Sequence, residues 1–201
     1  MDIVTYISII IGILGIIGTF YFGFKSVYLQ QKIKKYDWKD VEIGIEEISN
    51  KIFKKFQPDV LLSLSGPGSI VANLMLTKTA KFIPLYVGIS KKINSKDFTF
   101  EPQKMKTITT TRWKTYIPDE IFKLNNKRIV IIEDAVITGD TLNKLVNVLI
   151  KNGIKRKNIL TISLFTTELA VSSNKGPNIY WIKQKDSDFY LPWGNCLGKG
   201  Y

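Results

Sequence analysis

Residues 128–142 read RIVIIEDAVITGDTL, and no other stretch of the sequence indicates the fold class as strongly. Four apolar residues, 129–132, lead directly to two adjacent carboxylates, Glu133 and Asp134. A short loop follows, and the spacing of apolar residues over 141–152 predicts a helix that ends before Gly153. A buried strand followed by a loop and a helix is the repeating unit of parallel α/β sheets.

The chain on both sides of this stretch alternates in the same way. Apolar residues at helical spacing predict a helix over 39–56. Runs that are apolar almost throughout predict buried strands, at 60–65, 82–89 and 159–165. Residues 90–118 are basic and poorly periodic, which leaves two alternatives, a mobile loop or an excursion of two short strands. The alternation predicts a parallel sheet with helices on both faces.

Composition excludes several kinds of chemistry. The 201 residues include 29 Lys and Arg against 17 Asp and Glu, so the formal net charge is +12. The absence of histidine excludes Ser-His-Asp and Cys-His catalysis and any zinc site that uses imidazole. The single cysteine, Cys196, excludes an internal disulfide. The charge favours a polyanionic partner, which would be nucleic acid, anionic lipid or a phosphorylated small molecule.

The N-terminal segment is strongly apolar, because residues 3–24 carry no charge. A helix needs about 20 apolar residues to cross the hydrocarbon core of a membrane. A cleaved signal peptide would carry a basic start and a small-residue cleavage site, and this segment has neither. We expect a transmembrane anchor over residues 1–24 and a basic juxtamembrane tether over 25–37. Four lysines follow the segment and only Asp2 precedes it, so we expect a single-pass protein of the inner or plasma membrane with a cytoplasmic C-terminal domain.

The loop after the two carboxylates is suited to bind an anion. Ligands of parallel sheets bind at the carboxyl ends of the strands. Loop amides and a helix N-terminus attract phosphate, while Gly139 allows close approach and Thr138 and Thr141 offer hydroxyls. The two carboxylates suit ribose hydroxyls, which they would bind directly or through Mg²⁺.

This arrangement resembles the phosphoribosyltransferase signature, in which an apolar strand, two acidic residues, a loop containing Thr-Gly and a further Thr follow one another. The resemblance implies that Glu133 and Asp134 are the catalytic and Mg²⁺-binding residues and face the ribose hydroxyls of phosphoribosyl pyrophosphate (PRPP). It implies that the 5′-phosphate lies in a loop formed by Ala135, Val136, Ile137, Thr138, Gly139, Asp140 and Thr141. The alternative is an ordinary strand–helix unit with a capping threonine and a solvated acidic pair.

The resemblance covers residues 38–201, which it implies form one α/β domain with the parallel sheet of type I phosphoribosyltransferases, closest to xanthine and hypoxanthine enzymes. It implies a flexible catalytic loop over 91–117 and a small C-terminal hood over 166–201 that covers the base. Trp181 and Trp193 of the hood are the expected base-binding residues. The family's pyrophosphate loop corresponds to Ser65, Gly66, Pro67 and Gly68.

Three features depart from the family's pattern. The pyrophosphate loop usually carries a basic residue, whereas residues 65–68 carry no charge. Purine-specific members have an acidic residue at the position of Ile137, whose aliphatic side chain cannot transfer a proton. They also have a lysine where this chain has Thr166 and Thr167. The phosphate and ribose half of the predicted site is kept, and the base half is changed.

Two functions fit these observations. The first is a membrane-anchored, Mg²⁺-dependent phosphoribosyltransferase that acts on PRPP and a nucleobase or related acceptor. The second is a catalytically diverged domain that binds a phosphoribosyl compound or a nucleotide as a sensor. Nucleic-acid binding is disfavoured, because the lysines are dispersed and no recognition motif is present. Related domains commonly pair, so the resemblance also implies a homodimer.

Overall fold

A computed structural model describes residues 3–93 and 102–195 of the chain. Its centre is a five-stranded sheet in which all neighbouring strands are parallel. The strand order is β3-β2-β7-β8-β9, with β2 at Val60–Ser63, β3 at Leu85–Val87, β7 at Ile129–Val136, β8 at Ile159–Thr167 and β9 at Ile179–Gln184. The predicted parallel α/β sheet is therefore confirmed, and β7 is its central strand.

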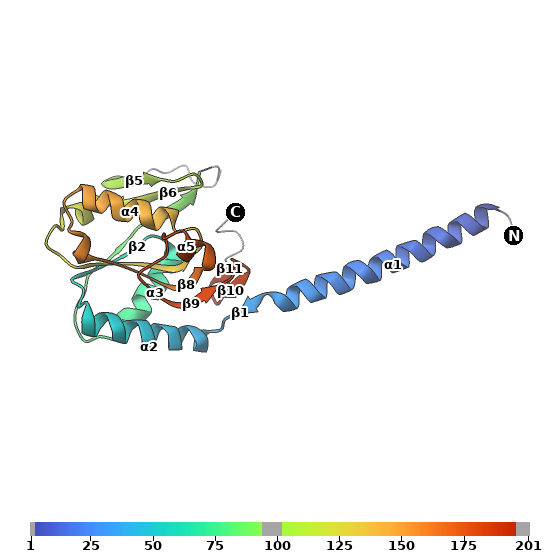
Figure 1. Ribbon diagram of the computed structural model, residues 1–201, viewed down its shortest axis with the longest axis horizontal. Helices are drawn as coiled ribbons and strands as arrows, with labels where there is room; N and C mark the ends of the chain where they lie inside the picture. The colour runs from blue at the N-terminus through green and yellow to red at the C-terminus, as the bar shows by residue number, and fades with distance from the viewer. Residues whose placement is uncertain (1–2, 94–101, 196–201) are drawn as a thin grey trace.

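Helices cover both faces of this sheet (Figure 1). On one face, α2 (Trp38–Lys55) and α3 (Gly66–Leu76) pack on apolar side chains such as Val130 and Ile132. On the other face, α4 (Asp140–Lys151) and the short α5 (Glu168–Ser172) pack on side chains such as Ile129 and Ile131. Alternate residues of β7 thus point into two separate cores, as the pleat of a strand requires.

Local sequence explains why α2 forms where it does. Asp37 and Asp40 form a reciprocal capping box, in which each carboxylate accepts a hydrogen bond from the other residue's backbone N–H. The buried side of the helix includes Val41, Ile45 and Ile52, which follow helical spacing. Two short 3₁₀ helices, η1 (Asp119–Lys123) and η2 (Arg156–Asn158), precede β7 and β8.

The stretch between β3 and β7 forms a separate antiparallel sheet, which we call the arm. Its strands are β4 (Ile89–Lys92), β5 (Met105–Thr109) and β6 (Trp113–Pro118), in the order β4-β6-β5. Of the two alternatives that the sequence left open for residues 90–118, the structure supports the excursion of short strands. Residues 94–101 of the predicted flexible loop lie outside the described residues.

A third sheet joins the two ends of the α/β domain. Strand β1 (Lys34–Lys35) pairs in parallel with β10 (Phe189–Leu191), and β10 pairs with β11 (Gly194–Asn195). The predicted C-terminal hood therefore contains a strand that comes from the N-terminal side of the domain.

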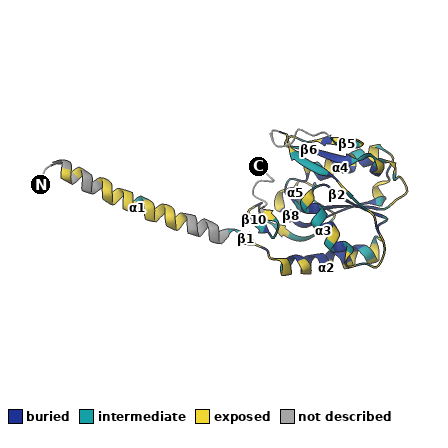
Figure 2. Cartoon of the chain, turned by 180° about the vertical axis from the view of Figure 1, so that it is seen from behind, coloured by how far each residue is buried: buried dark blue, intermediate teal, exposed yellow. Residues whose placement is uncertain are grey.

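The N-terminal helix α1 (Ile3–Lys32) extends away from the domain (Figure 1), and its described apolar side chains are mostly exposed (Figure 2). In the part of the chain that the structure describes, no helix combines the length and the hydropathy that crossing a membrane requires. The structure thus does not support the transmembrane anchor predicted over residues 1–24. Residues 1–2, and the side chains of residues 3, 4, 6 and 8–10, lie outside the described part of that segment.

Candidate active site

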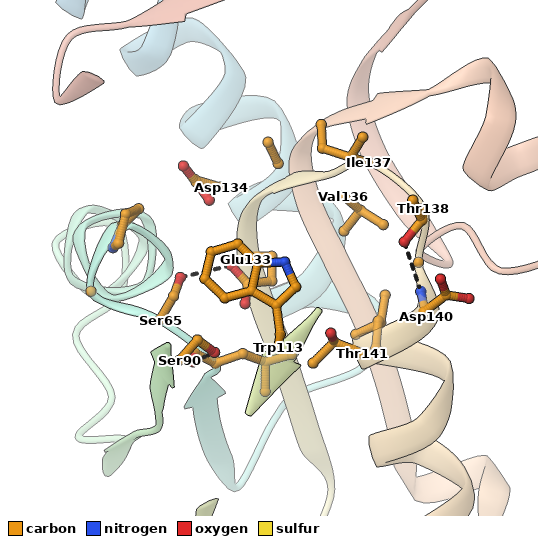
Figure 3. Close-up of a pocket in the computed structure, with 16 residues that line it drawn as sticks. Ser65, Ser90, Trp113, Glu133, Asp134, Val136, Ile137, Thr138, Asp140 and Thr141 are labelled. Atoms are coloured by element: carbon orange, nitrogen blue, oxygen red, sulfur yellow. Dashed lines mark hydrogen bonds between the residues drawn. The ribbon is translucent and has the colours of Figure 1, made fainter. Parts of the chain in front are cut away.

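A cavity of about 270 Å³ lies at the carboxyl ends of β2 and β7 (Figure 3). Three parts of the chain line it. Residues 64–67 follow β2, Ser90 and Trp113 come from the arm, and residues 133–142 run from β7 into the first turn of α4. The structure therefore brings together the predicted acidic pair, the whole predicted phosphate loop from Ala135 to Thr141, and three of the four predicted pyrophosphate-loop residues, Ser65, Gly66 and Pro67.

Glu133 is held by the segment that follows β2. Its Oε2 accepts a hydrogen bond of 2.8 Å from Ser65 Oγ, and Ser65 Oγ in turn accepts one of 3.1 Å from the backbone N–H of Gly68. A Cβ atom at position 68 would lie 2.9 Å from the Ile132 carbonyl and 3.2 Å from Glu133 Oε2. Gly68 is absent from the cavity lining, but its missing side chain lets α3 approach the carboxylate closely.

The predicted pyrophosphate loop is the start of a helix. Ser65 is the N-cap of α3, and Gly66, Pro67 and Gly68 form its first turn. Proline is compatible with this position, because the first N–H groups of a helix have no partner within the helix. The segment has no basic side chain, Pro67 has no N–H, and the Gly68 N–H is bonded to Ser65 Oγ. The groups that can attract an anion here are therefore the Gly66 N–H and the partial positive charge of the helix N-terminus.

Asp134, the second acidic residue, is contacted by the hood, whereas Glu133 is contacted by the segment after β2. Asp134 is fully buried, and its Oδ2 accepts a hydrogen bond of 3.0 Å from the indole Nε1 of Trp193. The two carboxylates border the same cavity but are oriented by different parts of the chain.

The phosphate loop is fixed by a contact with the segment after α5. Gly139 has a left-handed backbone (φ 73°), and a Cβ atom there would lie 2.0 Å from the Lys175 carbonyl oxygen. The Lys175 ammonium lies 2.7 Å from Asp140 Oδ1, and this hydrogen bond lowers the pKa of the Asp140 carboxyl. Gly139, the N-cap of α4, has no side chain, and the Asp140 N–H donates to Thr138 Oγ1 at 3.4 Å. An anion here would bind the N–H groups that follow in the first turn.

Trp113 is a cavity residue that the sequence did not suggest. Its indole projects into the middle of the cavity, in front of Glu133 (Figure 3). The neighbouring strand supplies Ser90, whose hydroxyl donates to the Leu64 carbonyl at 2.8 Å and bonds Thr115 Oγ1 at 2.9 Å. No periodic signal could have found Trp113, because the apolar residues Trp113, Tyr116 and Ile117 of this strand do not alternate with polar ones.

The two hood tryptophans do not line the cavity. Trp181 packs between β9 and α2, where a Cβ atom on Gly44 would lie 2.6 Å from the indole, and its ring centroid is 5.6 Å from that of Phe165. Gly44 leaves space for the Trp181 indole against α2, and the role of Trp181 in binding a base stays a prediction. Trp193 contacts Asp134 and Trp38 instead.

The cavity lining is acidic. Among its described residues, the charged side chains are Glu133, Asp134 and Asp140, and no Lys or Arg is present. The described part of the chain contains no cluster of three or more His, Cys, Asp or Glu side chains that could hold a metal ion. Carboxylate and hydroxyl oxygens suit Mg²⁺, which is often held by one or two carboxylates together with substrate phosphates. The donor set therefore fits a Mg²⁺ ion that shares its ligands with a phosphorylated molecule.

Comparison with known proteins agrees with this geometry. Residues 35–187 match the phosphoribosyl transferase domain. The chain belongs to the phosphoribosyl transferase domain family. The predicted family is thus confirmed, and the matched residues extend from β1 to just before β10. No curated protein sequence matches the chain significantly.

Solved structures share the phosphoribosyltransferase fold. A purine phosphoribosyltransferase from Pyrococcus horikoshii is 22% identical with a TM-score of 0.56, over 80% of this chain and 95% of that chain. A hypothetical protein from Neisseria gonorrhoeae with bound ppGpp is 17% identical with a TM-score of 0.59, over 80% and 89%. The xanthine-guanine-hypoxanthine phosphoribosyltransferase of Helicobacter pylori is 15% identical with a TM-score of 0.51, over 80% and 90%. At these identities the likeness establishes the fold.

Proposed function

We propose that this chain binds PRPP with Mg²⁺ and transfers its phosphoribosyl group to a nucleobase or a related acceptor. One observation carries this proposal: a single cavity joins Glu133 and Asp134 to the starts of two helices, α3 and α4. PRPP carries a phosphate at one end of its ribose and a pyrophosphate at the other. Two helix starts beside one pair of carboxylates match that distribution of charge.

The 5′-phosphate would bind the backbone amides and hydroxyls between Thr138 and Thr141, where α4 begins. The pyrophosphate would face the first turn of α3, which follows Ser65. This arrangement explains how a segment without a basic residue can bind a polyanion, because helix N-termini contribute partial positive charge there. The ribose would lie between these two sites, above Glu133.

Glu133 and Asp134 would accept hydrogen bonds from the ribose hydroxyls and orient the anomeric carbon toward the acceptor. Their negative charge would also stabilise the positive charge that develops on the sugar as pyrophosphate leaves. When bound, Mg²⁺ held by these carboxylates and by phosphate oxygens would neutralise the leaving pyrophosphate. The Trp113 indole would cover the ribose from the arm side and exclude water from it.

The acceptor side of the cavity supports a change in base recognition. Ile137 is buried, and Thr167 Oγ1 donates a hydrogen bond to its carbonyl. Thr166 Oγ1 donates to the Val136 carbonyl at 3.3 Å. Both threonines thus bind the phosphate loop, which leaves the recognition of the base to other groups.

Isotope-labelled PRPP with Mg²⁺ and a panel of purine and pyrimidine bases tests the transferase function. We expect the release of pyrophosphate with at least one base, and its loss in Glu133→Gln. Glu46→Gln, on the exposed side of α2, is the matched control and should keep full activity. Absence of pyrophosphate release with every base would overturn the transferase proposal.

A nucleotide sensor is the second candidate. The structural relative from Neisseria gonorrhoeae was solved with ppGpp, and Ile137 cannot transfer a proton to or from a base. Calorimetry with Mg²⁺ and guanine nucleotides, ppGpp included, tests this function. Tight binding without turnover would support it, and weaker binding of nucleotides than of PRPP would contradict it.

We further propose that a lipid bilayer covers the exposed apolar side chains of α1 and that the domain lies on the cytoplasmic side. Ile11, Leu14 and Phe24 are each more than 60% exposed, and Lys25 and Lys34 suit anionic headgroups. Membrane fractionation of the full chain tests this. We expect Leu14→Lys combined with Ile17→Lys to release the protein, and equal sedimentation of both forms would contradict it. The homodimer stays a prediction, which analytical ultracentrifugation in detergent would test.

A further inference from the structure

The two parts of the chain that flank the matched family domain meet each other. The match covers residues 35–187, so Lys34 and strands β10 and β11 lie outside it. Lys34 pairs with Phe189 and Lys35 with Tyr190 in a parallel register, and the N–H of Tyr36 donates to the Tyr190 carbonyl at 3.0 Å. An N-terminal strand therefore holds the C-terminal strand in place.

This junction reaches the candidate active site through Trp193, which lies in the turn between β10 and β11. The Trp193 indole donates to Asp134 Oδ2 at 3.0 Å, and its ring centroid is 5.6 Å from that of Trp38, the first residue of α2. Tyr36, between β1 and α2, is buried, and its ring centroid lies 4.5 Å from that of Phe165. Its hydroxyl accepts a hydrogen bond from the Gln184 amide. Residues 34–38 thus contact the hood at Gln184, at β10 and at Trp193 itself.

A buried carboxylate depends on donors for its position and its solvation. Asp134 is fully buried at the centre of the sheet, and a Trp193 donor would fix the direction of its second oxygen. We propose that Trp193 is a positioning residue that orients Asp134 toward a ribose hydroxyl, and that residues 34–38 set the position of Trp193. This inference rests on the proposed binding of a phosphoribosyl ligand.

Calorimetry of the full chain with Mg²⁺ and three sugars tests the role of Trp193. The sugars are ribose 5-phosphate and its 2-deoxy and 3-deoxy analogues. Trp193→Phe keeps the ring beside Trp38 and removes the N–H. We expect Trp193→Phe to weaken the binding of ribose 5-phosphate about tenfold, which is the effect of losing one hydrogen bond to a charged group. We expect the affinity for one of the two deoxy analogues to stay unchanged. An equal loss for all three sugars, or no loss, would overturn the positioning role.

Hydrogen exchange of the indole N–H groups tests the link to residues 34–38 without any ligand. Trp193→Phe identifies its signal in protein labelled with ¹⁵N-tryptophan. We expect Trp38→Ala and Asp134→Asn each to speed exchange of this N–H at least about tenfold, because each removes a contact that protects it. Ile43→Ala, on the exposed side of α2, is the control.

Unchanged exchange in Trp38→Ala would overturn the link to residues 34–38. If the wild type bound none of the sugars while the exchange results held, the proposed function would fail. The contacts that connect residues 34–38, Trp193 and Asp134 would then only stabilise the fold. Their proposed role in ligand binding would be overturned.

Discussion

Ser65 Oγ donates a hydrogen bond to Glu133 Oε2 across 2.8 Å and joins residues that are 68 positions apart. The same oxygen accepts the N–H of Gly68 and so caps α3. One hydroxyl therefore performs two tasks, since it begins a helix and orients a carboxylate of the cavity. The two tasks can be separated by experiment.

Ser65→Ala should lower both stability and affinity. Loss of the N-cap costs about 1 kcal/mol of unfolding free energy. Loss of the hydrogen bond to Glu133 should weaken the binding of PRPP about tenfold. Urea unfolding and calorimetry measure the two effects, and Ser65→Thr, which keeps a hydroxyl, is the control. A loss of stability with unchanged affinity would show that Ser65 only caps the helix.

Gly139→Ala should damage the phosphate loop more than a typical glycine substitution. The left-handed backbone alone costs a non-glycine residue about 1–2 kcal/mol, and the new Cβ would overlap the Lys175 carbonyl oxygen, 2.0 Å away. We expect destabilisation of about 2 kcal/mol or more by urea unfolding. Gly66→Ala is the comparison, because a Cβ atom at position 66 would have nothing within 4 Å; equal effects at the two positions would refute the role of the Lys175 contact.

Trp113 should report ligand binding by fluorescence, because its indole lies inside the cavity. We expect tryptophan emission to change when Mg²⁺ and PRPP are added, and Trp113→Phe to remove most of that change. Trp113→Ala should weaken the binding of the ligand about tenfold or more, which is the range measured for the loss of aromatic stacking. Trp181→Phe, in the core, should keep the fluorescence response; its loss there instead would place the ligand near the hood.

The pair Asp59–Arg128 should make stability depend on pH. The Arg128 backbone N–H donates to Asp59 Oδ2 at 2.8 Å and lowers the pKa of Asp59, and the guanidinium lies 3.4 Å away. Because the folded pKa is lowered, this stabilisation is full above the unfolded value of about 3.9 and is lost as pH falls through the folded pKa.

Asp59→Asn should therefore cost about 1 kcal/mol at pH 7 and progressively less below about pH 4. Thermal unfolding from pH 7 to pH 2.5 measures this difference, with Glu46→Gln as the control on an exposed surface. A difference from wild type that stayed constant over this range would rule out the ionic contribution.

The local pattern of residues 129–142 was enough to predict β7, the loop and α4, because a strand, a glycine turn and a helix start are set by neighbouring residues. The same reasoning failed for contacts between distant segments. Trp181 enters the core because Gly44, on another element, leaves room for it. Trp113 reaches the cavity because the arm packs beside α4, and no periodic pattern over 90–118 predicts that placement. Ser65 was predicted as part of a loop, and its bond to Glu133 depends on β2 and β7 being neighbours.

The acidic lining of the cavity contrasts with the net charge of +12. The outer surface attracts polyanions of every kind, whereas in the described lining the starts of α3 and α4 attract phosphate and the carboxylates of Glu133 and Asp134 oppose it. We expect this contrast to make the site selective: nucleic acid and metal-free phosphosugars would bind the outer surface weakly and would bind the cavity less well than metal-bound ones. An anion that brings a divalent ion would be favoured, because the ion offsets the charge of these carboxylates, so the availability of free magnesium would influence the occupancy of the site.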